Sequence, residues 1–263
     1  MMVATIGQAS RWERVRRRVF FVWAATLALL FGLLFIGVTA LTVWLWFAHQ
    51  NSNTNPVTDL GFFALGGVII TGGLVAQLRT PERRIAGIQQ AVVGLLALGS
   101  GGLIGARIEP LIGAVIFLLA TVLLVALHPA RRIFFTLGPC PSPRLITLSL
   151  LAALPALPYA AAMLVQARQA GPSCFFGRCA AGDRFAEMAA LALALVALGL
   201  LTAFKPQGWR VTAWSVAAAA VIVGGASLVW PTLPGALGQV GGAAALLWGV
   251  LFAAVAAWEE RLA

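Results

Sequence analysis

Charged residues are scarce in this chain, and their scarcity excludes an ordinary soluble protein. Only 10% of the 263 residues are charged and eight are acidic, whereas 61% are hydrophobic. A soluble domain averages about 25% charged and about 45–50% apolar residues. The mean hydropathy of +0.95 therefore predicts a protein embedded in lipid. Since no polar stretch is long enough for a separate soluble domain, we expect one helical membrane domain.

The residues that hold metals, retinal or nucleotides are also few. Three cysteines and two histidines show no spacing typical of a zinc or iron–sulfur site. The only lysine, Lys205, ends an apolar segment and is expected to reach the headgroups, whereas a retinal Schiff base needs a mid-span lysine. The glycines at 99–102 lack phosphate-loop spacing. We expect no retinal, nucleotide or zinc site; the sequence leaves other cofactors open.

Long apolar segments make up most of the chain. A membrane-spanning helix needs about 20 mainly apolar residues, and helix is the expected form because an open strand leaves its backbone unsatisfied in lipid. The sequence predicts an all-α polytopic membrane protein with eight transmembrane helices, over residues 19–48, 60–78, 85–106, 110–128, 145–167, 185–204, 210–230 and 238–258.

Arginine alternates between the predicted loops. Summed over alternate loops and tails, fourteen basic residues fall on one side and four on the other. The positive-inside rule then places both termini in the cytoplasm, with a basic tail over 1–18, a membrane domain over 19–258 and a short tail over 259–263. Because loop arginines also meet anionic lipids, the net charge of +10 indicates no nucleic-acid partner. The alanine, leucine, glycine and arginine bias favours a bacterial plasma membrane.

The second and third spans resemble the sixth and seventh. Asp59 precedes the turn proline Pro81 by 22 residues, and Asp183 precedes Pro206 by 23. This pattern predicts two parallel four-helix halves, 19–132 and 145–261. Coincidence is the alternative, since proline and basic residues are common at cytoplasmic turns.

Four polar residues near the predicted outer boundary are candidates for acid–base chemistry. They are His49, Asp59, Asp183 and Glu187, and a histidine with carboxylates can transfer protons. No nucleophile or metal-binding set accompanies them. The alternative for Asp59 and Asp183 is helix capping, because carboxylates are favoured at helix N-termini.

Glu187 lies one turn inside its predicted span. Ionisable groups inside spans are costly and often functional. Asp183 precedes it by four residues and shares its helix face, and Arg184 precedes it by three and can pair with it. Glu187 and Arg184 are therefore candidates for a ligand site or solute pathway.

The fifth span contains two prolines and the only tyrosine. Pro155 and Pro158 each remove a helix hydrogen bond, and broken helices form substrate sites in some transporters. Tyr159 is positioned to face such a site. Gln89 and Gln90 in the third span are further pathway candidates, although both kinds of feature also occur in ordinary helix packing.

Cys174 and Cys179 flank a four-residue segment in the 168–184 loop. That loop is predicted to face an oxidising compartment, so we expect a structural disulfide. Cys140 lies on the opposite side and is expected to be a free thiol.

Three functions remain open from the sequence. The favoured one is a non-enzymatic accessory or assembly subunit that packs in lipid against another membrane protein or a second copy, because its loops are short and small residues are frequent. The second is a small-solute transporter or channel that uses Glu187 and the fifth span. The third is a membrane enzyme with an outer His/carboxylate site.

Overall fold

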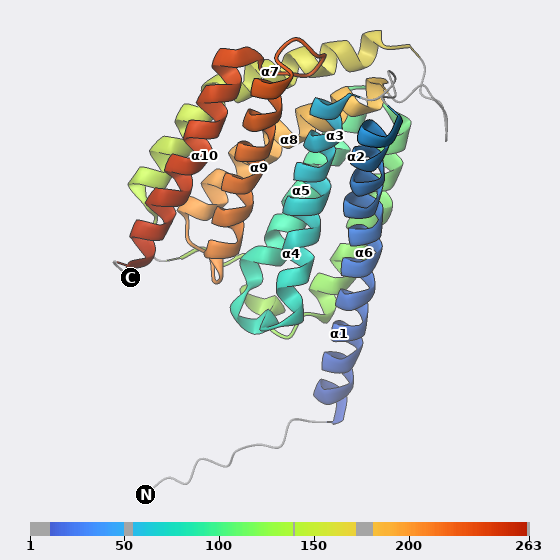
Figure 1. Cartoon of the computed structure of the whole chain (residues 1–263). Coiled ribbons are helices and arrows are strands. Elements are labelled where there is room, and N and C mark those ends of the chain that lie inside the picture. The colour runs from blue at the N-terminus through green and yellow to red at the C-terminus, as the bar shows by residue number, and fades with distance from the viewer. Residues whose placement is uncertain (1–10, 50–54, 139, 172–180, 262–263) are drawn as a thin grey trace, which may run out of the picture.

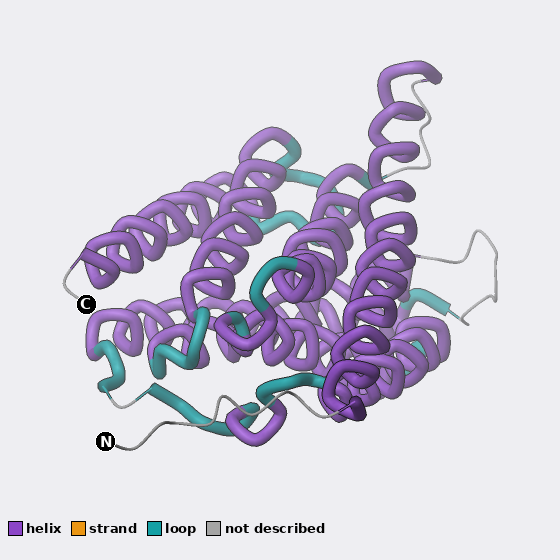
Figure 2. The backbone as a smooth tube through the Cα atoms, turned by 90° about the horizontal axis from the view of Figure 1, so that it is seen from below, coloured by secondary structure: helices purple, strands orange, loops and turns teal. Residues whose placement is uncertain are grey.

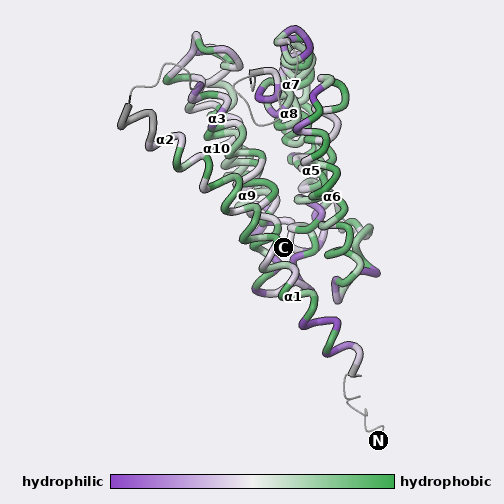
Figure 3. The backbone as a smooth tube through the Cα atoms, turned by 90° about the vertical axis from the view of Figure 1, so that its right-hand side faces the viewer, coloured by the Kyte–Doolittle hydropathy of each residue, from purple (hydrophilic) through white to green (hydrophobic). Residues whose placement is uncertain are grey.

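The computed structural model describes residues 11–49, 55–138, 140–171 and 181–261. Within these stretches every regular element is a helix and none is a strand (Figure 2). Eight helices are long and apolar enough to cross a membrane, which confirms the expected number and is consistent with an integral membrane protein. Apolar residues run along the helices, and hydrophilic residues gather toward their ends (Figure 3).

The helices extend slightly beyond the expected bounds. The first begins inside the segment expected to be a basic tail, and the last continues into the expected C-terminal tail. By span, the elements are α1 (Arg11–Phe31), η1 (Gly32–Gly37) and α2 (Val38–His49); α3 (Pro56–Phe62), η2 (Phe63–Thr71), α4 (Gly72–Val75) and η3 (Ala76–Leu78); α5 (Ile85–Ile104); α6 (Ile108–Leu127); α7 (Pro143–Gln169); α8 (Ala181–Ala203); α9 (Trp209–Val229); and α10 (Gly238–Arg261), with short turns η4 (Pro81–Arg83) and η5 (Arg131–Ile133).

Four spans form the centre of the bundle and four surround them. In the most apolar window of each span, 61% of the residues are buried in the second, third, sixth and seventh spans, against 17–33% in the others. α5 packs against α8, and α9 packs against the second span, while α6, α7 and α10 cover the outside (Figure 1). The outer faces of the peripheral spans carry exposed leucines suited to lipid, for example Leu29, Leu119, Leu154 and Leu247.

Small residues let the central helices approach one another and the peripheral α10 closely. A Cβ added at Gly101 of α5 would lie 2.5 Å from the Ala186 carbonyl oxygen of α8, and one at Gly224 of α9 would lie 2.6 Å from the Leu246 nitrogen of α10. Both neighbours are backbone atoms, which cannot move aside. The helices therefore pack backbone to backbone, as membrane helices often do when small residues line their contact.

The second span departs from a regular α-helix. Its middle, η2, is π-helical, and the shorter π-helical segment η1 lies against it. The Thr71 hydroxyl donates to the Gly66 carbonyl five residues back at 2.8 Å. Gly66 lies against the Phe35 ring, which would collide with any side chain there. Wide π-helical turns are rare, and apolar periodicity alone did not predict this one.

We call the end of the bundle where α8 begins and α9 ends the outer end, and the opposite end the inner end. At the inner end Glu259 of α10 joins three elements. Its Oε1 accepts a hydrogen bond from the Ser142 hydroxyl at 2.8 Å and lies 3.5 Å from Arg144, and its Oε2 lies 2.6 Å from Lys205 Nζ. Lys205, expected to reach the headgroups, is instead paired with this buried carboxylate. The last turn of α10 is thereby held to the start of α7 and the end of α8.

We predict that Glu259→Gln lowers the thermal unfolding temperature in detergent. The amide keeps the shape but loses the charge, so a charge-assisted bond worth about 1.5–3 kcal/mol is lost. The matched control is Glu260→Gln, because Glu260 pairs with Arg210 at 2.6 Å between largely exposed side chains and such pairs contribute about 0–1 kcal/mol. Equal effects of the two variants would contradict this assignment.

Candidate functional site

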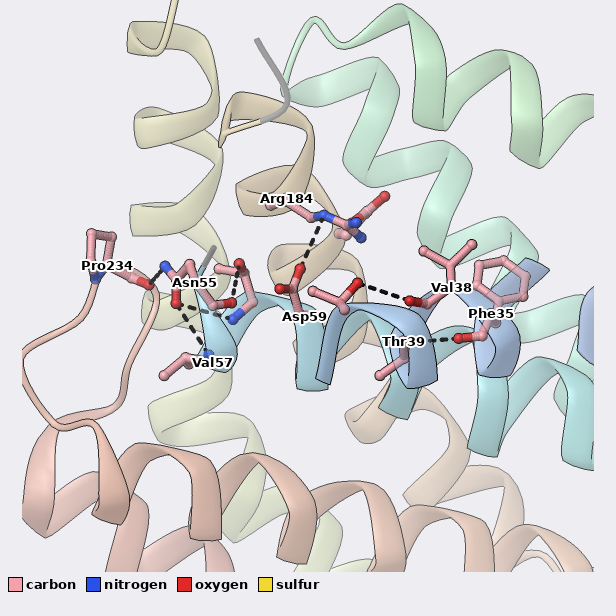
Figure 4. Close-up of polar contacts among 11 residues, drawn as sticks. Phe35, Val38, Thr39, Asn55, Val57, Asp59, Arg184 and Pro234 are labelled. Carbon is pink, nitrogen blue, oxygen red and sulfur yellow. Dashed lines mark hydrogen bonds and ion pairs between the residues drawn. The ribbon is translucent and has the colours of Figure 1, made fainter. Parts of the chain in front are cut away.

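Arg184 is the centre of an ion cluster at the outer end (Figure 4). Its Nη1 lies 3.0 Å from Glu187 Oε2 on α8, and its Nε lies 3.8 Å from Asp59 Oδ1 on α3. The guanidinium also stacks on the Phe62 ring, 4.2 Å from its centroid. The structure thus brings together three of the expected candidates, Asp59, Arg184 and Glu187. Sequence spacing indicated the Arg184–Glu187 pair and could not indicate Asp59, which belongs to a distant span.

Asn55, and not Asp59, caps the second span. The Asn55 side chain accepts a hydrogen bond from the Val57 nitrogen at 3.1 Å, and its Nδ2 donates to the Pro234 carbonyl at 2.7 Å. These bonds fix the start of α3 against the turn between α9 and α10 (Figure 4). Asp59 lies one turn further in and is free to face Arg184.

Asp183 is buried beside the same cluster, but its side chain accepts no hydrogen bond from the described residues. Its side chain is 5% exposed, and neither carboxylate oxygen has a hydrogen-bond partner among the described residues. Arg107, a neighbour by charge, is also buried and donates to the Ala167 and Gly171 carbonyls, the latter at 2.6 Å. The Asp183 carboxylate can only accept hydrogen bonds, and no described residue donates one to it.

Several expected site residues are not placed. His49 ends α2, but its side chain lies outside the described part of the structure, so the proposed histidine–carboxylate pairing is untested. Cys174 and Cys179 also lie outside the described residues. Cys140 is exposed and free, as expected. Across the described stretches, no group of histidine, cysteine and acidic residues is suited to hold a metal ion.

A cavity of about 500 Å³ lies between α7, α8, α9 and α10. Pro155 and Tyr159 line it, together with apolar or small residues that include Ala192 and Ala245; Pro158 is not among its lining residues. The two prolines do not interrupt the fifth span, because α7 is one continuous helix through both, as the packing-helix alternative expected. No pattern within one segment indicates the cavity, since it depends on the side-chain volumes of four separate helices.

Two hydrogen bonds join α7 to the α9–α10 hairpin on either side of the cavity. The Tyr159 hydroxyl donates to the Gly235 carbonyl at 2.6 Å, and the Trp248 indole donates to the Leu148 carbonyl at 2.9 Å. Residues 148 and 159 are separated along the helix by about 16 Å, at 1.5 Å per residue. The two polar side chains that line the cavity thus have partners already, so the wall offers mainly hydrocarbon.

The two glutamines expected as pathway residues join helices instead. Gln90 Nε2 donates to the Ile69 carbonyl at 2.6 Å and to the Ser215 hydroxyl at 2.9 Å. Gln89 Nε2 donates to the Phe134 carbonyl. Neither lines the cavity. Both bond across elements, as polar groups in membrane bundles often do.

At the inner end His128 is buried, which the sequence did not indicate. Its Nδ1 accepts from the Ala130 nitrogen at 3.0 Å, so its Nε2 carries the proton and faces Gln77 Oε1 at 3.2 Å. Gln77 in turn donates to the Arg84 carbonyl at 2.8 Å. Burial lowers the pKa of His128 to about 4, against the opposite effects of the Pro81 backbone and the Glu82 charge. This neutral histidine joins the inner ends of the second, third and fourth spans.

We predict that His128 makes the protein less stable as pH falls from about 6.5 to about 4. Its ordinary pKa of 6.5 falls to about 4 on folding, so in this range the unfolded chain binds a proton that the folded chain does not. The check is the unfolding temperature of wild type and His128→Asn at pH 7.5 and pH 5. The variant should show the smaller loss on acidification; parallel losses would contradict the assignment.

Comparison with protein-family models, with curated proteins and with solved structures found no match. The class of the protein therefore follows from its own structure: within the described residues it is a bundle with eight helices long and apolar enough to cross a membrane, consistent with an integral membrane protein.

Proposed function

We propose that this chain is a non-enzymatic integral membrane protein that holds one lipid-like molecule in the cavity between α7 and α10. The observation that carries the proposal is the cavity itself, whose volume of about 500 Å³ and largely apolar wall suit a hydrocarbon chain. Ligand cavities are typically about 300–1,000 Å³ and mainly apolar. Such binding fits an accessory or assembly role, in which the protein packs against another membrane protein or a second copy.

The proposal includes two parallel four-helix halves. Gln90 and Ser215, which hydrogen-bond to one another, each follow their turn proline by nine residues. Equivalent residues meet in this way at a twofold axis along the membrane normal. A tryptophan also joins the two peripheral spans of each half, with donor and acceptor exchanged. The Trp23 indole of the first span donates to the Ala120 carbonyl of the fourth at 3.0 Å, whereas the Trp248 indole of the eighth donates to the Leu148 carbonyl of the fifth at 2.9 Å.

The two halves differ at the position of the cavity. In the N-terminal half, phenylalanine rings fill the space between the first, second and fourth spans: Phe31 and Phe117 lie 4.4 Å apart, and Phe35 and Phe62 lie 4.8 Å apart. In the C-terminal half, alanines such as Ala192 and Ala245 leave the corresponding space open. Aromatic packing is thus available to the same architecture, and the open space lined by small residues between α7 and α10 supports a ligand site.

A transporter is the less favoured alternative. The described charged side chains of the cluster around Arg184 and of the network around Glu259 lie toward the two ends of the bundle, and none lines the cavity. A pathway for a small polar solute needs polar groups at mid-depth. The continuous helix α7 also removes the broken element on which this hypothesis relied.

We predict that filling the cavity displaces its ligand. Ala245→Phe places a ring in the cavity wall and should reduce the lipid retained by detergent-purified protein about tenfold, a loss equal to about 1.4 kcal/mol. The measurement is native mass spectrometry. Ala254→Phe, on an exposed position of the same helix, is the matched control and should retain lipid as wild type does. Equal retention by all three proteins would overturn the proposal.

The proposed location is a bacterial plasma membrane, with both termini in the cytoplasm, and it predicts a labelling pattern. In a background with serine at 174 and 179, Thr232→Cys should react with an impermeant maleimide added to intact cells. Thr232 is exposed at the outer end, and Cys140 is exposed near the inner end. Cys140 is thus the internal control and should react only after lysis; the reverse pattern would contradict the orientation.

A further inference from the structure

We infer that the molecule held in the cavity is a zwitterionic lipid whose head carries a primary ammonium and a phosphate. In this arrangement the ammonium donates to Glu187 and Asp59, and the phosphate contacts Arg184. This inference rests on the proposed function, since it identifies the polar end of the molecule whose chain occupies the cavity.

The ion cluster lies on the same stripe of α8 as the cavity wall. Met188, Leu191 and Leu195 line the cavity, and residues separated by three, four or seven positions share one helix face. Arg184 precedes Met188 by four residues, and Glu187 precedes Leu191 by four. The stripe therefore changes from apolar to charged within one turn at its outer end, as the binding surface for an amphiphile must.

The outer end of the cavity and the ion cluster also share their neighbours. Met188 packs against Gly61 of α3, where any side chain would collide with its sulfur. The Gly235 carbonyl accepts the hydrogen bond from Tyr159 of the cavity wall. Gly235 is also close to Thr58, because a Cβ added at Gly235 would lie 3.1 Å from the Thr58 methyl carbon. Thr58 directly precedes Asp59. A headgroup at the cluster and a chain in the cavity can thus belong to one molecule.

The charge balance of the cluster selects a cation. Two carboxylates, Asp59 and Glu187, face one guanidinium, Arg184, and their side chains are only 12%, 12% and 24% exposed. Asp183 adds a third negative charge, whose oxygens lack hydrogen-bond partners among the described residues and whose charge faces Arg107. An ammonium group offsets this excess and supplies the N–H donors that carboxylates require. A purely anionic head would meet more negative than positive charge.

Arg184 is suited to the phosphate of the same head. Its Nε–Asp59 distance of 3.8 Å is an ion pair but too long for a hydrogen bond, so a phosphate oxygen can compete for this donor. Arg also binds phosphate in a planar, two-point geometry. The stacking on Phe62 keeps the guanidinium at the junction of α3 and α8.

The test uses the full chain in detergent with an equal mixture of phosphatidylethanolamine, phosphatidylcholine and phosphatidylglycerol of matched chains. Native mass spectrometry reports which lipid is retained. We expect ethanolamine lipid to be enriched about tenfold over glycerol lipid, with choline lipid between them because its ammonium has no N–H. With Glu187→Gln the three lipids should be retained in nearly equal amounts, while the total amount of retained lipid stays unchanged.

Two further variants keep the result interpretable. Glu82→Gln, at an exposed ion pair with Arg17 at the other end of the bundle, is the matched control and should keep the wild-type preference. If Glu187→Gln does not elute as a monodisperse protein, Asp59→Asn tests the same cluster from α3. Retention of lipid without preference, or a preference for glycerol lipid, would overturn the headgroup inference alone. Absence of any retained lipid from wild type would overturn the proposed function itself.

Discussion

The close approach of the central helices is the constraint on which the rest of the structure depends. Lipid gives helices no hydrophobic reason to associate, so contact surfaces must fit closely. Gly73 of α4 against α5 and Gly101 of α5 against α8 provide that fit between central spans through backbone contacts, and Gly224 of α9 does the same for the peripheral α10. Once the second, third, sixth and seventh spans are held together in this way, the other four are placed around them with one face toward the bundle and one toward the surroundings.

The pairing of buried polar groups follows from the same lipid surroundings. A buried polar atom without a partner is costly in a medium that supplies no hydrogen bonds. At the inner end Glu259 and His128 therefore hold several partners each. At mid-depth Gln90 binds both the second and the seventh spans. At the outer end both carboxylate oxygens of Asp183 are buried without a partner among the described residues, whereas Gln89, Gln90 and Arg107 each leave a single atom without one.

The amino-acid sequence predicts the eight helices, but it does not predict which residues meet at the candidate site. Long apolar runs predict the eight helices, because each run is a property of one local segment. The pairing of Arg184 with Glu187 is also local. Asp59 joins that pair from a different span, so only the packed bundle places it there. Within the π-helical η2, Gly66 lies against Phe35 of another span, and no periodicity within one span records such a contact.

Two hydrogen bonds and a set of small side chains account for where the cavity occurs. The bonds from Tyr159 and Trp248 join α7 to the α9–α10 hairpin on either side of the cavity. Small side chains such as Ala192 and Ala245 line the space between these helices. Between the first and fourth spans, by contrast, the Phe31 and Phe117 rings lie 4.4 Å apart. Empty apolar volume costs stability when nothing occupies it. An open apolar space beside these two hydrogen bonds is therefore costly when empty, which favours the proposed hydrocarbon ligand.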